Sequence, residues 1–503
     1  MTAHKNPLKD ISILIICLIA FVIIWILHPQ NCAPSDPFAY SSRAFALAEN
    51  GFLDNVLTFD YRIGLTAPVA LFYKLFGISL YSTNLWPMLT VLGLIVGVWL
   101  VLPNSKTKAI GAGVCVLSAP LYQWSSTLFP DIVAAMFMFF ASYLLWRRDD
   151  TLHHRFWILF PLLSMTLLFC GFLTKMTAYW VIPLWILQLG FDIHHRRWDL
   201  LRRFHFAAFL CGLVLLIGYC IFSYYIYGHP IARFLVIQSL HEDHLWSWSR
   251  VPLEALIRRV TISPIKLFTL EYGLLFPIAI ISIFAVARNM RFWWYYTMIL
   301  IGLYWFGSTN FSYYNPLPIS KRDIISTLPG LVILSALMID KVAQKTCLWK
   351  YQIKVLFFAA ISLSVLLLFS YYLFQWQKMR PIEPQAMTAF KKVINDPSKR
   401  SSLLICADKR NPTYLPFYFA FKNPDNLTIK YAANVTEQDI KNKDIYVYHN
   451  KILSSFLTSR YDYRDYGQVL STLENQVIFH TPHISITQIQ NTDKLWPLLN
   501  SER

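Results

Sequence analysis

Long apolar runs separated by short polar segments dominate the sequence. Eleven of these runs approach the roughly 20 residues that a membrane-spanning helix needs. They lie near residues 11–27, 84–102, 109–127, 131–146, 156–173, 177–190, 205–227, 271–287, 292–307, 324–340 and 354–374. The pattern predicts an all-α polytopic membrane protein with about 11 transmembrane helices, in which residues 1–374 form one transmembrane domain.

Basic residues gather in every second connection between the runs. They are Lys106, Lys108, Arg147, Arg148, Arg155, Arg196, Arg197, Arg202, Arg203, Arg288, Arg291, Lys341, Lys345, Lys350 and Lys354. Because short loops rich in Lys and Arg stay in the cytoplasm, we expect the N-terminus to be cytoplasmic. An odd number of spans then places the C-terminal segment on the extracytoplasmic side.

Two predicted outer loops, 28–83 and 228–270, are far longer than a turn requires, which is typical of functional loops. Loop 28–83 contains two helix-like stretches, Asp36–Asn50 and Leu65–Phe76. Each is followed by a glycine that can end a helix. We therefore expect two short helices on the outer side of the membrane.

The C-terminal segment, residues 375–503, is more polar than the rest of the chain. Three short β-rich runs, 402–407, 427–431 and 444–448, alternate there with helix-compatible segments. This alternation predicts a small extracytoplasmic soluble α/β domain. The segment contains no glycine motif for nucleotide binding, so we assign it no catalysis.

The composition supports this interpretation and excludes an ordinary soluble globule. Hydrophobic residues make up 56% of the 503 residues and charged residues 15%, with a mean hydropathy of +0.42. A net charge of +17 is common in nucleic-acid-binding proteins. In a polytopic protein the same excess reflects cytoplasmic loops, so we expect no nucleic-acid partner.

Two aspartates stand at predicted outer helix starts. Asp36 follows the first apolar run, and Asp131 opens the fourth after Pro130. An aspartate at a helix start commonly caps the helix. The same carboxylate could be a general base for an acceptor hydroxyl or amine, and two of them could together bind a divalent metal. The spacing of the two residues leaves these interpretations open.

Four cations also fall on the predicted outer side. Lys175 occupies the short break between two runs, Arg62 lies in the first outer loop, and Lys321 and Arg322 precede the tenth run. A lysine at this depth can extend to the lipid headgroups or bind a phosphate. Arginine matches phosphate geometry with its planar fork, although a headgroup contact explains each cation equally well.

Further candidates lie beside these charges and in the second long loop. Tyr40 and Tyr61 are close in sequence to Asp36 and Arg62, and could contact an acceptor. The run His241-Glu242-Asp243-His244 contains metal-ligating residue types. Its spacing differs from that of zinc-protease helices, so a solvated loop is the favoured interpretation.

The order of these motifs resembles the GT-C superfamily of polytopic glycosyltransferases. In particular, it is similar to relatives of the protein O-mannosyltransferases (dolichyl-phosphate-mannose-protein mannosyltransferase-like) and of the aminoarabinose transferase acting on lipid A. The resemblance covers most of the membrane part. The matching segments are Asp36-Pro37-Phe38-Ala39-Tyr40, Arg62-Ile63-Gly64, Pro130-Asp131, Gly171-Phe172-Leu173-Thr174-Lys175, and Lys321-Arg322 before Leu328-Pro329-Gly330. Arg62-Ile63-Gly64 departs from the proline pair that many relatives have in this loop.

The resemblance implies a GT-C-like fold in a bacterial inner (plasma) membrane. It also implies transfer of a sugar, with inversion, from a polyprenyl-phosphate-linked donor to a lipid, glycan or protein acceptor on the extracytoplasmic side. Asp36 would activate the acceptor, with Asp131 as the second outer acid. Arg62, Lys175, Lys321 and Arg322 would bind the donor phosphate. The resemblance implies no certain cofactor, and a divalent metal stays open.

Two other classes of protein would also place ionisable residues in a polytopic chain. A surface-polysaccharide polymerase or ligase also handles polyprenyl-linked glycans, but usually gathers its basic residues in one large late outer loop. A non-enzymatic lipid or glycan transporter would place ionisable residues at mid-membrane on broken helices, with internal repeats. Here the charges spread over several outer loops and the apolar runs hold almost none, which favours the glycosyltransferase.

Overall fold

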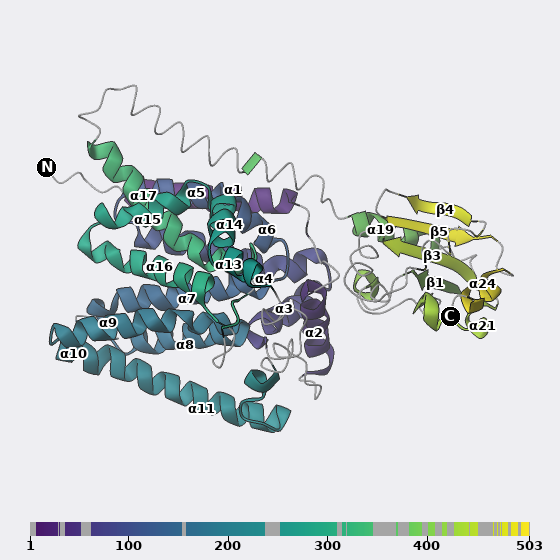
Figure 1. Ribbon diagram of the computed structural model, residues 1–503, viewed down its shortest axis with the longest axis horizontal. Coiled ribbons are helices and arrows are strands. Elements are labelled where there is room, and N and C mark those ends of the chain that lie inside the picture. Colours follow the sequence, from purple (N-terminus) through teal and green to yellow (C-terminus); the bar gives the residue numbers. More distant parts are fainter. Residues whose placement is uncertain are drawn as a thin grey trace.

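The computed structural model describes residues 7–28, 30, 36–51, 62–152, 157–236, 252–308, 314–317, 319–345, 369–370, 382–394, 401–407, 415–419, 427–441, 443–450, 466, 470, 473, 475–480, 484–490 and 494–501. They form a large helical part and a smaller part that contains a β-sheet (Figure 1).

The helices of the large part follow one another closely along the chain. They are α1 (Pro7–Leu27), α2 (Asp36–Asn50), α3 (Ile63–Phe76), α4 (Leu80–Val101), α5 (Ser105–Val116), α6 (Ala119–Ser125), α7 (Pro130–Trp146), α8 (Leu159–Thr174), α9 (Ile182–His194), α10 (Trp198–Leu200), α11 (Ala207–Tyr227), α13 (Leu253–Val260), α14 (Ile262–Tyr272), α15 (Leu275–Ile281), α16 (Arg291–Phe306) and α17 (Leu328–Lys345). Short 3₁₀ segments η2 (Arg148–Leu152), η3 (Met176–Val181) and η8 (Asp323–Thr327) and the π-helical η4 (Leu201–Phe206) join them.

Among the described residues, five continuous helical segments are long and apolar enough to cross a membrane. They are Asp10–Leu27, Leu80–Val101, Met176–His194, Trp198–Tyr227 and Asp323–Gln344. Large apolar side chains on these helices are exposed, among them Ile16 and Val214, as expected for a surface that faces lipid. The chain is therefore a multi-pass membrane protein.

Ten of the eleven predicted apolar runs fall on helices of the described residues. The eleventh, 354–374, lies outside them apart from Phe369 and Ser370. The number of spans and the cytoplasmic side of the N-terminus stay predictions. Within the described residues, α7, α8 and α11 lie side by side and extend along the long direction of the molecule (Figure 1).

Two of the predicted spans are not single straight helices, so these predictions were wrong in detail. The run 109–127 divides into α5 and α6, because Pro120, the second residue of α6, has no N–H to continue the hydrogen bonding of the preceding helix. The run 271–287 breaks at Gly273, whose φ of 53° turns the chain so that α14 and α15 meet at 110°.

The two helices predicted in the first outer loop are confirmed as α2 and α3. Each is followed by a glycine with a positive φ, 76° at Gly51 and 72° at Gly77, the conformation that commonly ends a helix. A chain of buried hydroxyls ties them to the bundle. Tyr73 on α3 lies 2.6 Å from the Ser41 hydroxyl on α2 and 2.8 Å from the Thr83 hydroxyl on α4.

The predicted C-terminal α/β layer is also present, with two strands more than predicted. The sheet has the order β2-β1-β3-β5-β4, formed by β1 (Ser402–Cys406), β2 (Leu427–Tyr431), β3 (Asp444–Asn450), β4 (Asn475–His480) and β5 (Ile484–Ile489). Strands β2, β1 and β3 are parallel, whereas β5 runs antiparallel to β3 and β4.

Alternate residues of the interior strand β1 contribute to two hydrophobic cores, one on each face of the sheet. Leu404 packs in the cluster that includes α19 (Ile382–Ile394), and Leu403 packs in the cluster that includes α24 (Leu495–Ser501). Phe38 of α2 packs against the first of these clusters, so this part of the chain contacts the helical part beside Asp36.

Candidate active site

Charged residues from four separated segments meet at one end of the helical bundle. Asp36 begins α2, and Asp131 is the second residue of α7. Lys175 lies between α8 and η3, while Arg322 and Asp323 begin η8, which continues into α17. We call these five residues the outer cluster, because they lie on the predicted extracytoplasmic side.

Lys175 joins two of the carboxylates. Its Nζ contacts Asp131 and lies 2.9 Å from Asp323. Asp323 also accepts hydrogen bonds from the backbone N–H of Ser320 at 2.9 Å and from its hydroxyl at 2.7 Å. Burial disfavours the charge on Lys175, but the two carboxylates raise the pKa of its ammonium above the ordinary value. One cation thus balances two acids.

Arg322 joins the third carboxylate to this group. Its Nη1 donates to Asp36 Oδ2 at 2.9 Å, and its guanidinium lies 4.7 Å from the centre of the Phe129 ring. Burial opposes the charge on Arg322, whereas the carboxylates of Asp131 and Asp36 raise its pKa. The Asp36 side chain is 36% exposed and that of Asp131 only 3%. Asp36 is therefore the more accessible carboxylate.

Arg62 reaches the same region from the start of α3. It immediately precedes the helix, and its guanidinium lies 4.9 Å from the centre of the Tyr40 ring. Gly64 allows this placement, because a Cβ there would lie 2.4 Å from the Thr174 hydroxyl and 2.8 Å from the Cys170 carbonyl. The start of α3 therefore packs directly against the end of α8, next to Lys175.

Arg233 is a functional candidate that the sequence analysis missed. It follows α11 and is 2% exposed. Its Nη1 donates to the Phe172 carbonyl at 2.5 Å, and its guanidinium lies over the Phe172 ring. Burial lowers its pKa to about 10 against the opposing effect of Tyr219, and the charge of Arg62 lowers it further. Neither Arg62 nor Arg233 forms an ion pair with a described residue, and the charge of Arg62 acts on Arg233.

The remaining predicted residues separate into three groups. Lys321 is half exposed and binds the buried Glu271 at the end of α14 at 2.5 Å, so its ion-pair partner is not one of the other predicted site residues. Tyr40 is fully buried on α2, and burial raises the pKa of its hydroxyl. Tyr61 and the run 241–244 (His241, Glu242, Asp243, His244) lie outside the described residues.

The divalent metal stays a prediction. Among the described residues, no group of three or more His, Cys, Asp and Glu side chains is close enough to hold a metal ion. Between Asp131 and Asp323, the space where a cation would be bound is taken by the ammonium of Lys175.

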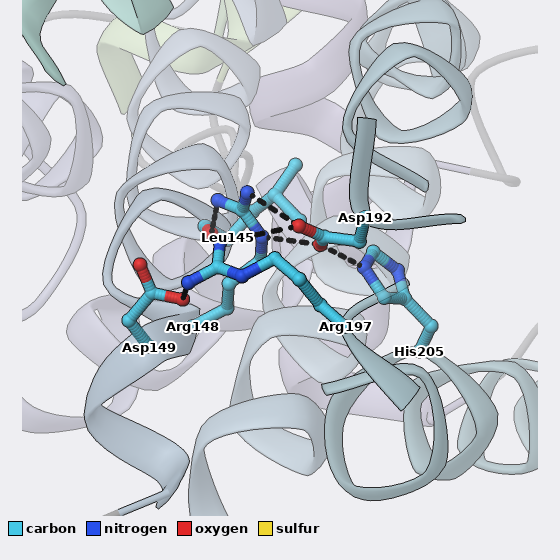
Figure 2. A network of polar contacts seen from close by, with 6 residues as sticks. All are labelled: Leu145, Arg148, Asp149, Asp192, Arg197 and His205. Carbon is cyan, nitrogen blue, oxygen red and sulfur yellow. Dashed lines mark hydrogen bonds and ion pairs between the residues drawn. The ribbon is translucent and has the colours of Figure 1, made fainter. Parts of the chain in front are cut away.

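A second charged group lies at the opposite end of α7, on the predicted cytoplasmic side. Figure 2 shows the carboxylate of Asp192 facing Arg148, Arg197 and His205. Arg148 donates from Nε at 2.7 Å and from Nη2 at 3.1 Å, and Arg197 donates at 3.3 Å. His205 Nε2 lies 2.9 Å from the same carboxylate, and Arg197 also pairs with Asp149. We call these five residues the inner network.

Neither a protein-family model nor a curated protein sequence matches this chain, but solved structures do. ArnT from Cupriavidus metallidurans in the apo state has a TM-score of 0.56 at 13% identity, covering 94% of this chain and 97% of its own. The same protein bound to undecaprenyl phosphate has a TM-score of 0.59 at 12% identity, covering 97% and 99%.

A third similar structure is the apo oligosaccharyltransferase from Archaeoglobus fulgidus. It has a TM-score of 0.56 at 12% identity, covering 91% of this chain and 71% of its own. Both proteins are GT-C glycosyltransferases. At this level of identity the likeness shows the fold, and the fold is the one that the resemblance in the sequence predicted.

Proposed function

We propose that this chain, with its GT-C fold, is an integral membrane glycosyltransferase of a bacterial inner membrane. It transfers a sugar from a polyprenyl-phosphate-linked donor to a lipid, glycan or protein acceptor on the extracytoplasmic side. The observation that carries the proposal is the outer cluster. There the accessible carboxylate of Asp36, bound by Arg322, lies near cations suited to a phosphate.

The donor phosphate binds between Arg62 and Arg233. The charge of Arg62 lowers the pKa of Arg233, and neither guanidinium forms an ion pair with a described residue. A phosphate between them relieves this repulsion and accepts charge-assisted hydrogen bonds from both. Lys175 lies three residues beyond the Phe172 carbonyl that Arg233 binds, but Asp131 and Asp323 already balance its charge, so it contributes less at the phosphate than the two arginines.

Asp36 acts as the general base. Its side chain is accessible, and it accepts a hydrogen bond from Arg322 that orients the carboxylate. Asp36 takes the proton from the acceptor hydroxyl or amine as the acceptor attacks the anomeric carbon. The bond from that carbon to the phosphate oxygen breaks, and the polyprenyl phosphate leaves with its new negative charge. A single displacement of this kind inverts the anomeric configuration.

Asp131 positions the other charged residues of the site. Its buried carboxylate holds Lys175, which in turn holds Asp323 beside Arg322. Lys321 is bound to Glu271, so its contact with the donor phosphate comes second to those of Arg62 and Arg233.

The release of polyprenyl phosphate tests this function. Purified protein in proteoliposomes is incubated with polyprenyl-phosphate sugars and acceptors extracted from host membranes, and free polyprenyl phosphate is followed by mass spectrometry. The wild type releases it, whereas an Asp36→Asn variant of equal folded amount does not. Absence of release by the wild type, or equal release by both, contradicts the proposal. Passage of intact lipid-linked sugar across the bilayer without release identifies a transporter instead.

A further inference from the structure

Two neighbouring arginines on α13 have opposite environments. Arg258 is exposed, whereas Arg259 is 5% exposed. Leu253 and Ile257 of the same helix are exposed apolar residues. The helix is amphipathic in an unusual sense, because the side chain that it buries most deeply is a charged one.

The guanidinium of Arg259 binds three backbone carbonyls. Its Nη2 donates to Leu317 at 2.7 Å and to Tyr304 at 3.1 Å, its Nη1 donates to Trp305 at 3.2 Å, and its Nε donates to Leu317 at 3.2 Å. Tyr304 and Trp305 belong to the last turn of α16, where helix carbonyls lack intrahelical partners. The positive charge also complements the negative end of the helix dipole.

The contact is reinforced from the other side. The indole N–H of Trp305 donates to the Val260 carbonyl at 2.6 Å. The end of α13 and the end of α16 therefore bind each other through donors from both helices. A buried guanidinium with all these acceptors is well satisfied, and its removal leaves several buried carbonyls without a donor.

The Leu317 carbonyl that Arg259 binds belongs to a short segment, residues 314–317, which we call the strap. It folds back on the end of α16, where the backbone N–H of Leu317 donates to the Gly307 carbonyl at 3.3 Å and Ser308 pairs with Pro316 in an antiparallel bridge. The backbone N–H of Asn315 donates to the Ser308 hydroxyl at 3.0 Å. The chain then continues from the strap to Arg322 and Asp323.

We propose that Arg259 is a positioning residue, which holds the strap so that Arg322 meets Asp36 and Asp323 meets Lys175. The inference rests on the proposed function, in which Asp36 is the general base. Arg322 reaches Asp36 across 286 residues of sequence, so their contact depends on the path of the segment that carries Arg322. Arg259 fixes that path at its start.

Hydrogen exchange tests the positioning without any enzymatic assay. In nanodiscs, Arg259→Met is expected to raise the exchange of the backbone amides of Asn315, Leu317 and Ser320 by about tenfold or more, because the strap opens locally. Arg258→Met is the matched control and leaves this exchange unchanged. If Arg259→Met does not fold, Trp305→Phe removes the reciprocal donor and is expected to give a smaller increase at the same amides.

Kinetics then separate positioning from a general loss of structure. Arg259→Met is expected to lower kcat about tenfold and leave KM for the donor lipid within about twofold, because Arg62 and Arg233 keep their places. Arg259→Lys restores part of kcat, since a lysine keeps the charge but reaches fewer carbonyls.

A double variant gives the decisive comparison. If Arg259 acts through Arg322, the Arg259→Met/Arg322→Met protein is no less active than Arg322→Met alone. Additive losses, or unchanged exchange in the strap of a folded Arg259→Met protein, overturn the inference. Failure of the wild type to release polyprenyl phosphate, with the exchange result intact, overturns the proposed function and leaves the structural role of Arg259 standing.

Discussion

The two ends of α7 carry charged groups of opposite construction. In the inner network, one buried carboxylate, Asp192, accepts from two arginines and faces His205. In the outer cluster, the three carboxylates of Asp36, Asp131 and Asp323 share the cations of Lys175 and Arg322. The inner carboxylate therefore has three side-chain partners of its own, whereas the three outer carboxylates share two cations.

This difference separates a structural group of charges from a chemical one. A buried carboxylate surrounded by donors has no remaining capacity to take a proton from a substrate, and its contacts hold η2, α9 and η4 together. A partly exposed carboxylate with a single cation, such as Asp36, keeps lone pairs available for an acceptor. Charged residues at both ends of one helix therefore contribute to different properties of the protein.

The largest expected effect is on catalysis at the outer cluster. Asp36→Asn keeps the shape of the side chain but removes the base, and is expected to lower the rate of sugar transfer by about 10²–10⁴-fold. The melting temperature should stay close to that of the wild type, because the side chain is 36% exposed. Rates are measured on equal amounts of folded protein. A variant that keeps more than about a tenth of the wild-type rate contradicts the assignment of the base.

The converse effect is expected at the inner network. Asp192→Asn leaves the buried guanidinium of Arg148 without its anion, and is expected to cost roughly 3–5 kcal/mol of unfolding free energy. Asp149→Asn is the matched control, because Asp149 is 54% exposed and its pairing contributes about 1 kcal/mol or less. Denaturant unfolding in detergent measures the unfolding free energy of both variants. Similar losses of unfolding free energy in the two variants contradict the assignment of Asp192 as the central carboxylate of the inner network.

The pH dependence of stability tests how far Asp131 and Asp323 depend on Lys175. Because the pKa of Lys175 is raised, its contribution to stability is complete below pH 10.5 and declines only as the pH rises through its folded pKa. Lys175→Met leaves Asp131 and Asp323 unbalanced at a cost of about 2–3 kcal/mol near pH 8. Protonation of one acid relieves this cost.

The melting temperature of Lys175→Met is therefore expected to rise from pH 8 to pH 5 relative to that of the wild type. Thermal unfolding in the same detergent at both pH values gives this difference. A constant offset between variant and wild type across this range shows that the two acids do not depend on Lys175.

The smallest of these effects is expected for lipid binding. Arg233→Met removes one charge-assisted contact worth about 2 kcal/mol, which weakens binding of undecaprenyl phosphate about 30-fold. Native mass spectrometry with this lipid measures the change. Arg258→Met serves as the control, since Arg258 is exposed on a different helix. Equal affinity of both variants removes Arg233 from the proposed phosphate site.

The sequence predicted those features that a local pattern encodes. Apolar runs predicted the long helices, and a glycine after each of α2 and α3 predicted where these helices end. Strands β1 to β3 were visible as β-rich runs. β4 was missed because its residues, from Asn475 to His480, begin and end with polar side chains, and β5 pairs with it at the end of the sheet.

The partners within the site could not be predicted in the same way. Lys175 meets Asp323 across 148 residues of sequence, and Arg322 meets Asp36 across 286. Arg233 is a single charge between Ala232 and Phe234, with a carbonyl 61 residues away as its partner. Its isolation in an apolar segment of an outer loop was the available signal, because a charge in such a place is costly without a role.

One measurement tests the contrast between the two ends of α7 most directly. Surface glycolipids and glycoproteins are compared by mass spectrometry in cells that lack the protein and in cells that carry the wild type, Asp36→Asn or Asp192→Asn, normalised to folded protein. The sugar is expected with the wild type and with Asp192→Asn, and absent with Asp36→Asn and without the protein. A sugar that persists with Asp36→Asn, or spectra that do not depend on the protein, would contradict the account.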